Sequence, residues 1–137
     1  MRAARFAIIG GGFIGLEVAA SARSRGANVT LIEATPRLLS RGVPESIAAV
    51  IEARHHAEGV SVHCGVSVTQ IERHASSVVL TLSAGRDLSA DFLLIAIGAV
   101  PVIGLAEDAG LAIENGIAVD QYLRSSDPCI FAAGDCC

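Results

Sequence analysis

The sequence predicts an α/β domain of three layers, in which a parallel central sheet is accompanied by a three-stranded antiparallel β-meander. Hydrophobic residues make up 52% of the chain, whereas aromatic residues make up only 4%. Small and branched aliphatic side chains therefore dominate, as they do in parallel sheets that are covered on both faces. Near the N-terminus, short apolar runs alternate with helical patterns, which is typical of strand-helix-strand units. A later stretch has a period of two, which indicates antiparallel strands.

The charge pattern excludes several function classes. The chain of 137 residues carries 14 acidic and 10 basic residues, a net charge of -4, and every basic residue is Arg. A basic surface for nucleic acid is therefore not expected. Because the chain has no Lys, neither a Schiff base nor a P-loop lysine is available. The longest near-apolar stretch, 92–106, is interrupted by two Gly and one Pro and is shorter than the ~20 residues a bilayer requires, so we expect no membrane span.

Cysteine usage favours a reduced, cytoplasmic protein. Four Cys residues include no C-x-x-C pair and do not form a disulfide framework. Cys64 ends an apolar run and is expected to be a small core residue. His55 and His56 are neighbours on a predicted helix and point in different directions, so we expect no metal site there.

The first part of the chain predicts a compact βαβ unit. A buried strand over 5–10 enters a cluster of glycines, and a helix over 13–25 follows, with apolar residues at helical spacing on one face. Gly26 is a natural end for this helix. Residues 28–33 form the second strand.

The middle of the chain predicts a second helix and then mostly strands. Pro44 suits the first turn of a helix that Gly59 ends, and a short strand over 60–64 follows. The period of two between residues 66 and 88 predicts the meander. The run 92–97 has no alternation at all, which predicts a central parallel strand buried on both faces.

The C-terminal part has weaker patterns. We expect a loop over 98–104, a short helical turn over 105–109 and a tight hairpin at Asn115-Gly116. A final apolar triplet, 130–132, leads into Gly134 and Asp135.

The glycine cluster predicts a dinucleotide site. Residues 10–15 match G-x-G-x-x-G, directly after a strand and at the start of a helix. Gly10 permits the tight turn, Gly12 lets the backbone approach a pyrophosphate, and Gly15 allows the helix to pack close to the strand. Phe13 and Ile14 begin the helix, whose N-terminus offers free N–H groups to the phosphates. The alternative is an ordinary tight turn between a strand and a helix.

An acidic residue stands at the end of the second strand, where this kind of site requires one. Glu33 is expected to accept hydrogen bonds from an adenosine ribose and to repel the extra phosphate of NADP, which predicts NAD as the cofactor. Arg37 and Arg41 follow in the next loop. Either could pair with Glu33 or contact a phosphate, and we name Arg41 as a candidate cofactor ligand.

With Gly-Gly-Gly-Phe-Ile-Gly-Leu-Glu at 10–17, the sequence resembles the NADH-binding domain of the FAD-dependent pyridine nucleotide-disulfide oxidoreductases, whose pattern is G-G-G-x-I-G-x-E. The likeness is closest to the ferredoxin and rubredoxin reductases that serve bacterial oxygenases. It extends over Glu-Ala-Thr-Pro-Arg-Leu-Leu at 33–39, Ala-Ile-Gly-Ala-Val-Pro at 96–101 and Phe-Ala-Ala-Gly-Asp at 131–135.

The resemblance implies roles for residues that the glycine pattern alone does not assign. Glu17 would lie beside the nicotinamide ring as the catalytic residue, which we favour over the alternative of a solvated carboxylate in the first helical turn. Gly98 matches a glycine whose backbone passes close to the dinucleotide, and its alternative is a plain loop glycine. Pro101 also matches, but Val102 stands where the family usually has Asn.

The C-terminal residues resemble the second flavin fingerprint of the family, T-x6-A-x-G-D. Ser125 takes the place of the Thr, and Asp135 is the residue that would bind the flavin ribityl chain. The glycine fingerprint that forms the other half of a flavin site is not found in residues 1–137. We therefore expect 1–137 to be a single NAD(H)-binding domain of a larger flavoprotein, with 125–137 beginning the return into its FAD domain.

These expectations combine into one functional hypothesis. The chain would bind NADH and position it for hydride transfer to FAD, which only the full-length protein holds, and electrons would pass on to a ferredoxin or rubredoxin. The isolated chain is expected to be inactive. The alternatives are the corresponding domain of an NADH oxidase, a CoA-disulfide reductase or another disulfide reductase, and a non-catalytic dinucleotide-binding module.

Overall fold

The computed structural model describes residues 2–137, which divide into two compact units. The first unit ends at Gly98, and the second comprises Ala99–Cys137. The assignment of 1–137 to one domain stays a prediction. No helix within the described residues is long and apolar enough to cross a membrane.

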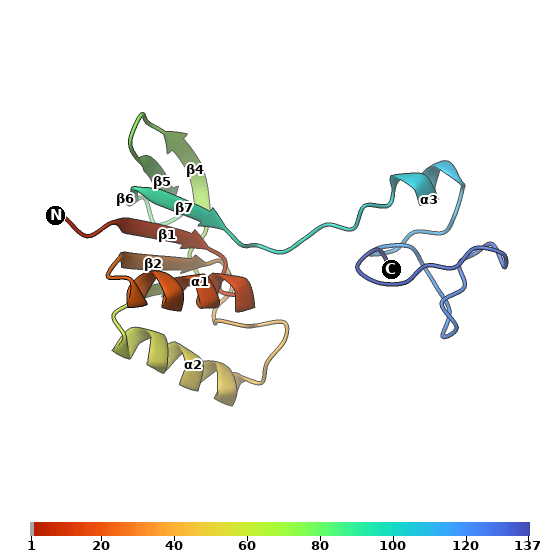
Figure 1. Ribbon diagram of the computed structural model, residues 1–137, viewed down its shortest axis with the longest axis horizontal. Helices are drawn as coiled ribbons and strands as arrows, with labels where there is room; N and C mark the ends of the chain where they lie inside the picture. The colour runs from red at the N-terminus through yellow and green to blue at the C-terminus, as the bar shows by residue number, and fades with distance from the viewer. Residues whose placement is uncertain (1) are drawn as a thin grey trace. The chain divides into compact units, whose positions relative to one another are not determined.

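A four-stranded parallel sheet forms the centre of the first unit (Figure 1). Its strands lie in the order β3-β2-β1-β7, and each neighbouring pair is parallel. From β1 the chain adds β2 and then β3 on one side, and it later adds β7 on the other side of β1. The strand order therefore reverses between β1 and β7. The strands are β1 Arg5–Ile9, β2 Asn28–Glu33, β3 Ser61–Cys64 and β7 Phe92–Ile95.

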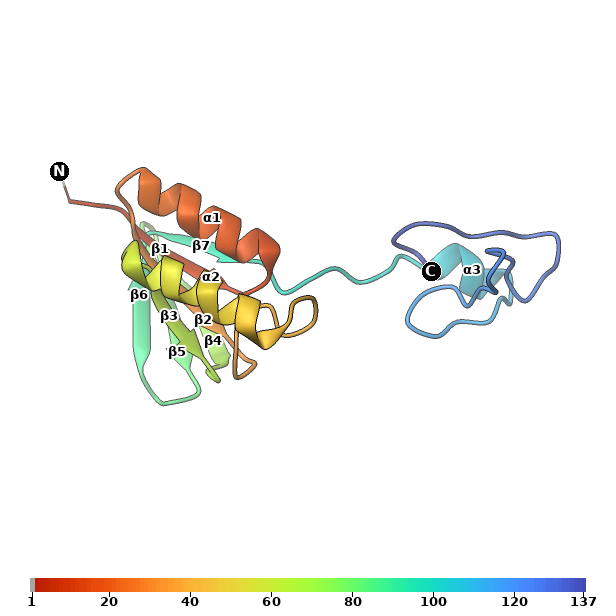
Figure 2. The same cartoon turned by 90° about the horizontal axis from the view of Figure 1, so that it is seen from below.

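Helices cover one face of this sheet and the meander covers the other (Figures 1 and 2). The predicted three-layer α/β fold is therefore confirmed, and so are both predicted helices and the three-stranded antiparallel meander. The helices are α1 Phe13–Ser24 and α2 Glu45–Ala57, and the meander strands are β4 Val68–Arg73, β5 Val78–Leu82 and β6 Asp87–Ala90.

The core has two parts, one on each face of the sheet. Because successive side chains of a strand point to opposite faces, Ile8 and Leu31 pack towards the helices while Ala7 and Ile32 pack towards the meander. The fully buried Leu80 anchors the meander in the second part. Strand β1 is apolar without alternation over 6–9 because both of its faces are covered.

The prediction of a central strand over 92–97 is wrong in its position and its length. Strand β7 ends at Ile95 and pairs, within the described residues, with β1 alone, so it lies at an edge of the sheet. Phe92 and Ile95 are each 54% exposed. Leu93 packs against the meander and Leu94 against the helices, which explains the apolar run. A run of apolar residues without alternation indicates that side chains on both faces of the strand are packed. It does not indicate whether one or two strands pair with that strand.

The second unit contains little regular structure. Helix α3 Gly104–Asp108 confirms the predicted helical turn. The predicted hairpin around Asn115-Gly116 is present only as an isolated antiparallel bridge between Ile113 and Ile117. The N–H of Ile117 donates to the carbonyl of Cys136 instead of continuing a ladder (2.7 Å).

Asp91 ties the beginning of β1 to the beginning of β7. Its carboxylate accepts hydrogen bonds from the main-chain N–H of Arg5 (2.9 Å), from the Arg5 guanidinium (2.7 Å) and from the Arg2 guanidinium (2.9 Å). The hydrogen bonds from the Arg5 side chain and main chain hold the pKa of Asp91 well below its ordinary value, against a smaller opposing effect of desolvation.

We expect Asp91→Asn to lower the midpoint of thermal unfolding at about pH 7, because the variant loses both ion pairs. A carboxyl whose native pKa is depressed contributes stability above its unfolded pKa, and this contribution is lost as the pH falls through the native pKa. The difference from wild type should therefore shrink as circular dichroism melts are repeated towards about pH 2.

Asp87→Asn is the matched control for this prediction. Asp87 accepts a hydrogen bond from the Thr81 hydroxyl (2.9 Å), and an Asn carbonyl can accept the same bond. A difference between wild type and Asp91→Asn that stays constant with pH would contradict the role of the ion pairs.

Candidate functional site

A groove of about 910 Å³ lies at the carboxyl ends of the parallel strands. It is formed by the loops that follow β1, β2 and β7 and by the beginning of the meander. In open α/β sheets, ligands bind at this edge, at the point where the strand order reverses. The groove is lined by Ile9–Ile14, Ile32–Thr35, Leu39–Gly42, Val66–Ile71 and Ile95–Gly98.

The three glycines of the predicted motif meet different constraints. Gly10 has a φ of +111°, and a Cβ added there would overlap the carbonyl of Ala96. A Cβ on Gly15 would overlap the carbonyl of Gly10, so Gly15 is what allows α1 to begin so close to β1. Gly12 differs from both, because a Cβ added there would have no atom within 4 Å. Gly10 and Gly15 are therefore required by the fold, whereas Gly12 has open space beside it.

The N-terminus of α1 faces this opening without a side-chain cap. Gly12 is the N-cap residue, no side chain caps it, and the first turn contains no acidic residue. The first helical hydrogen bond runs from the N–H of Leu16 to the carbonyl of Gly12 (3.1 Å). The preceding N–H groups therefore have no partner within the helix. Such an end attracts anions, and the missing side chain of Gly12 leaves open space beside it.

Glu33 ends β2 and is connected directly to the glycine loop. Its Oε2 accepts the N–H of Gly11 (2.6 Å), and its Oε1 accepts the N–H and the hydroxyl of Thr35 (2.7 Å each). Desolvation by burial raises the pKa of Glu33, but the hydrogen bonds from Thr35 and Gly11 and the charge of Arg41 outweigh it and lower the pKa. The carboxylate is therefore held in its charged form at the floor of the groove.

The two arginines of the following loop have separate roles. The guanidinium of Arg37 donates to the carbonyls of Leu38 (3.1 Å), Leu39 (3.3 Å) and Ser40 (3.2 Å), so it holds its own loop in shape. Arg41 lines the groove and acts on Glu33 by its charge. Of the alternatives left by the sequence, Arg41 is thus the one placed where a ligand could contact it.

Phe13 and Ile14 also line the groove, as the first two residues of α1. Their side chains are 61% and 66% exposed. Apolar side chains this exposed at the start of a helix leave an uncovered apolar rim beside the charged end of the groove.

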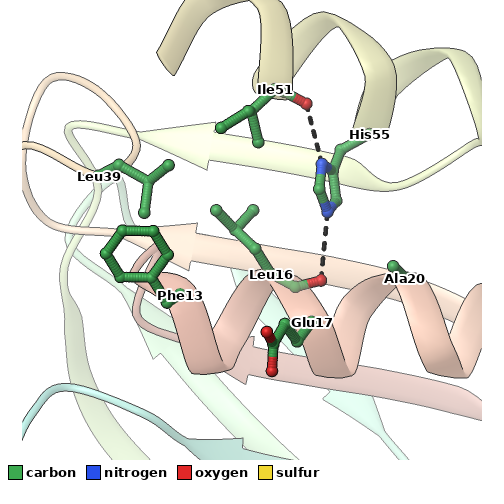
Figure 3. Close-up of a pocket in the computed structure, with 7 residues that line it drawn as sticks. All are labelled: Phe13, Leu16, Glu17, Ala20, Leu39, Ile51 and His55. Carbon is green, nitrogen blue, oxygen red and sulfur yellow. Dashed lines mark hydrogen bonds between the residues drawn. The ribbon is translucent and has the colours of Figure 1, made fainter. Parts of the chain in front are cut away.

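Glu17 lies elsewhere on α1, beside a smaller apolar hollow of about 240 Å³ between α1 and α2. Figure 3 shows that Glu17 and Phe13 lie on the same helix. Phe13 lines both the hollow and the main groove. His55 spans the two helices, with Nδ1 2.9 Å from the Ile51 carbonyl and Nε2 3.2 Å from the Leu16 carbonyl. Glu17 is exposed and is not among the residues that line the main groove.

The remaining predicted residues fall at two places. Gly98 lines the groove with a φ of +110° and ends the first unit. Asp135 belongs to the second unit, where its side chain is exposed. In the same unit, the Ser125 hydroxyl donates to the carbonyl of Asp127 (3.0 Å), within its own turn. The structure thus brings Gly98 together with the glycine loop.

Sequence reasoning missed Thr35 and the start of the meander as parts of the groove. The N–H of Gly65 donates to the Thr35 carbonyl (2.9 Å) and the N–H of Val66 to the Glu33 carbonyl (3.1 Å), which bring the meander beside the end of β2. The only sequence signal for Thr35 is its place two residues after the acidic strand end. Its hydroxyl could have been expected to bond locally, as Ser and Thr do in turns.

The fold and the site together define a protein of the Rossmann-like α/β class. The chain belongs to the pyridine nucleotide-disulphide oxidoreductase family, whose model matches residues 1–137.

Individual relatives are consistent with this family. The chain is 44% identical over 137 residues to a terpredoxin reductase of a Pseudomonas species, covering 98% of this chain and 34% of that protein. It is 39% identical to a rubredoxin-NAD(+) reductase of Ectopseudomonas oleovorans, covering 99% and 36% respectively. The solved ferredoxin reductase for the CYP199A2 system from Rhodopseudomonas palustris has a TM-score of 0.92 at 40% identity, covering 97% of this chain and 33% of that one. The chain thus spans about a third of the length of these relatives.

The different constraints on the glycines lead to a stability prediction. Gly10→Ala should lower the free energy of unfolding by at least about 2 kcal/mol, because the new Cβ meets a carbonyl at a strained φ. Gly12→Ala should change it by no more than about 1 kcal/mol, because its φ of -83° suits any residue and the space is open. Denaturant unfolding of both variants measures this, and equal losses would contradict the distinction.

Proposed function

We propose that the groove binds NAD(H) and that the chain is the NAD(H)-binding part of a flavin-dependent ferredoxin reductase. One observation carries the proposal. The uncapped N-terminus of α1 opens at Gly12 into the same groove that holds the charged carboxylate of Glu33. A site for an anion and a site for hydroxyl groups, joined in one groove, match the pyrophosphate and ribose of a dinucleotide.

Each part of the groove has a task in this proposal. The N–H groups at the start of α1 hold the pyrophosphate, with Gly12 allowing the close approach. Glu33 accepts the hydroxyls of the adenosine ribose, and its negative charge opposes a 2′-phosphate. Arg41 adds positive charge at the same end of the groove. The nicotinamide half is proposed to lie along Gly98 and the apolar side chains of Phe13 and Ile14, which also line the groove.

The redox step belongs to the full-length protein. When bound, NADH would supply a hydride to FAD, and the reduced flavin would pass the two electrons on one at a time. We propose that Glu17 positions the nicotinamide, since it lies one helical turn after Phe13 on the solvent side of α1. Asp135 is proposed to bind the flavin. No general acid or base is required of this chain.

The electron acceptor is proposed from the relatives. Two of them are named as reductases of terpredoxin and rubredoxin, which supports a ferredoxin or rubredoxin as the partner of this protein. This also favours the ferredoxin reductases over the disulfide reductases and oxidases considered from the sequence. A cytoplasmic location is part of the proposal, because all four cysteines are free in the described residues.

The cofactor preference is tested by titration calorimetry of the chain with NADH, NADPH and FAD. We expect NADH to bind and FAD to bind far less. Glu33→Arg should weaken NADH binding about tenfold or more, because a hydrogen bond to a charged group contributes about 1.5–3 kcal/mol, and should strengthen NADPH binding. Unchanged selectivity would refute the ribose role of Glu33.

Gly12→Ala is the control for that experiment. It narrows the room for the pyrophosphate, which both cofactors share, so it should weaken NADH and NADPH binding by the same factor. If Gly12→Ala instead changed the ratio of the NADH and NADPH affinities, Gly12 would not act through the pyrophosphate that both cofactors share.

The role of Glu17 is tested in the full-length flavoprotein. Glu17→Ala should slow reduction of the flavin by NADH about tenfold or more in stopped-flow measurements, because nicotinamide placement is disturbed. ADP binding should stay within about twofold of wild type, since the adenosine half does not reach Glu17. An equal loss of ADP binding would show that Glu17 is a structural residue of α1.

A further inference from the structure

The carboxylate of Glu33 is fixed mainly by one neighbour, Thr35. Oε1 of Glu33 accepts both the N–H and the hydroxyl of Thr35, each at 2.7 Å, while Oε2 accepts the N–H of Gly11 at 2.6 Å. A carboxylate has about four acceptor positions, so three donors leave acceptor capacity for a ligand. Thr35 also lines the groove, so the pair lies where a ligand would meet it.

The Thr35 hydroxyl has two acceptors and one proton. It lies 2.7 Å from Oε1 of Glu33 and 2.8 Å from the carbonyl of Arg37, and neither of these groups can donate. The proton goes to the carboxylate preferentially, because hydrogen bonds to ionised acceptors are stronger.

The main chain at Thr35 is held independently of its hydroxyl. Its carbonyl accepts the N–H of Gly65 (2.9 Å), and its N–H remains bonded to Glu33. Thr35 precedes Pro36, which favours the extended backbone that β-branched residues adopt. Replacing Thr35 by Val therefore removes the hydroxyl bond while the shape and the backbone of the loop are kept.

We propose that Thr35 is a positioning residue that sets the orientation of the Glu33 carboxylate and thereby the recognition of the adenosine 2′-hydroxyl. The inference rests on the proposed binding of NAD(H) in this groove. A carboxylate that is fixed before binding loses less conformational entropy when the ribose arrives, so the benefit falls on the hydroxyl contact and not on the pyrophosphate.

The test compares two ligands on the 137-residue chain. One is NADH and the other is its analogue that lacks the adenosine 2′-hydroxyl, both measured by calorimetry. In the wild type, NADH should bind more tightly than the analogue. Thr35→Val should weaken NADH binding about fivefold to tenfold, leave analogue binding within about twofold, and so reduce the preference. Thr35→Ser, which keeps the hydroxyl, should restore the preference.

A double-mutant cycle separates positioning from general structural damage. In a Glu33→Ala background there is no carboxylate to orient, so Thr35→Val should have no further effect on NADH binding. Three outcomes would each overturn the proposal. Thr35→Val could weaken the binding of both ligands equally, Thr35→Ser could fail to restore the preference for NADH, or the effects of Thr35→Val and Glu33→Ala on NADH binding could be additive. Failure of the wild type to bind NADH at all would instead refute the proposed function, on which the inference rests.

Discussion

The hydrogen bond from the Gly11 N–H to Glu33 (2.6 Å) is the interaction on which the site depends. It joins the loop after β1 to the end of β2, so the uncapped N-terminus of α1 and the acidic end of β2 are held together. The carbonyl of Gly11 accepts the N–H of Leu39 (3.0 Å), which adds the loop after β2 to the same point. Gly11 has no room for a side chain, since a Cβ there would lie 2.5 Å from Cδ2 of the buried Leu38 and 3.1 Å from Oε2 of Glu33. The middle glycine of the cluster is therefore a structural requirement of the groove.

Apolar burial and polar contacts together fix the shape of the loop after β2. Leu38 and Leu39 are buried in the core below α1. Leu39 has a φ of 52°, a conformation that costs a β- or γ-branched residue free energy and persists only when its surroundings fix it. The bonds from the Arg37 guanidinium to three carbonyls of this loop supply part of that fixation. Arg41 is thereby presented at the groove on a loop that is already ordered.

The sequence predicted those features that depend on neighbours in the chain. The tight turn at the glycines, the helix start at Phe13 and the place of Glu33 at the end of β2 depend on local backbone geometry. These features could be predicted. The edge position of β7 could not, because strand order depends on pairing between distant segments. The division of tasks between Arg37 and Arg41 was also left open, since the reach of a long side chain is decided by where the loop folds. Thr35 escaped notice because its importance arises from two oxygen atoms that are brought close only in the folded chain.

A match to G-x-G-x-x-G therefore combines two kinds of constraint that the pattern itself does not separate. Gly10 and Gly15 would be needed by any chain that turns so sharply from a strand into a helix, whether or not a ligand binds. Gly12 has open space and an unstrained φ, so the fold alone does not require a glycine there. A glycine at a position where a larger residue would fit costs backbone entropy. The proposed function supplies a reason for it, because the missing side chain leaves space for a phosphate at the uncapped end of α1.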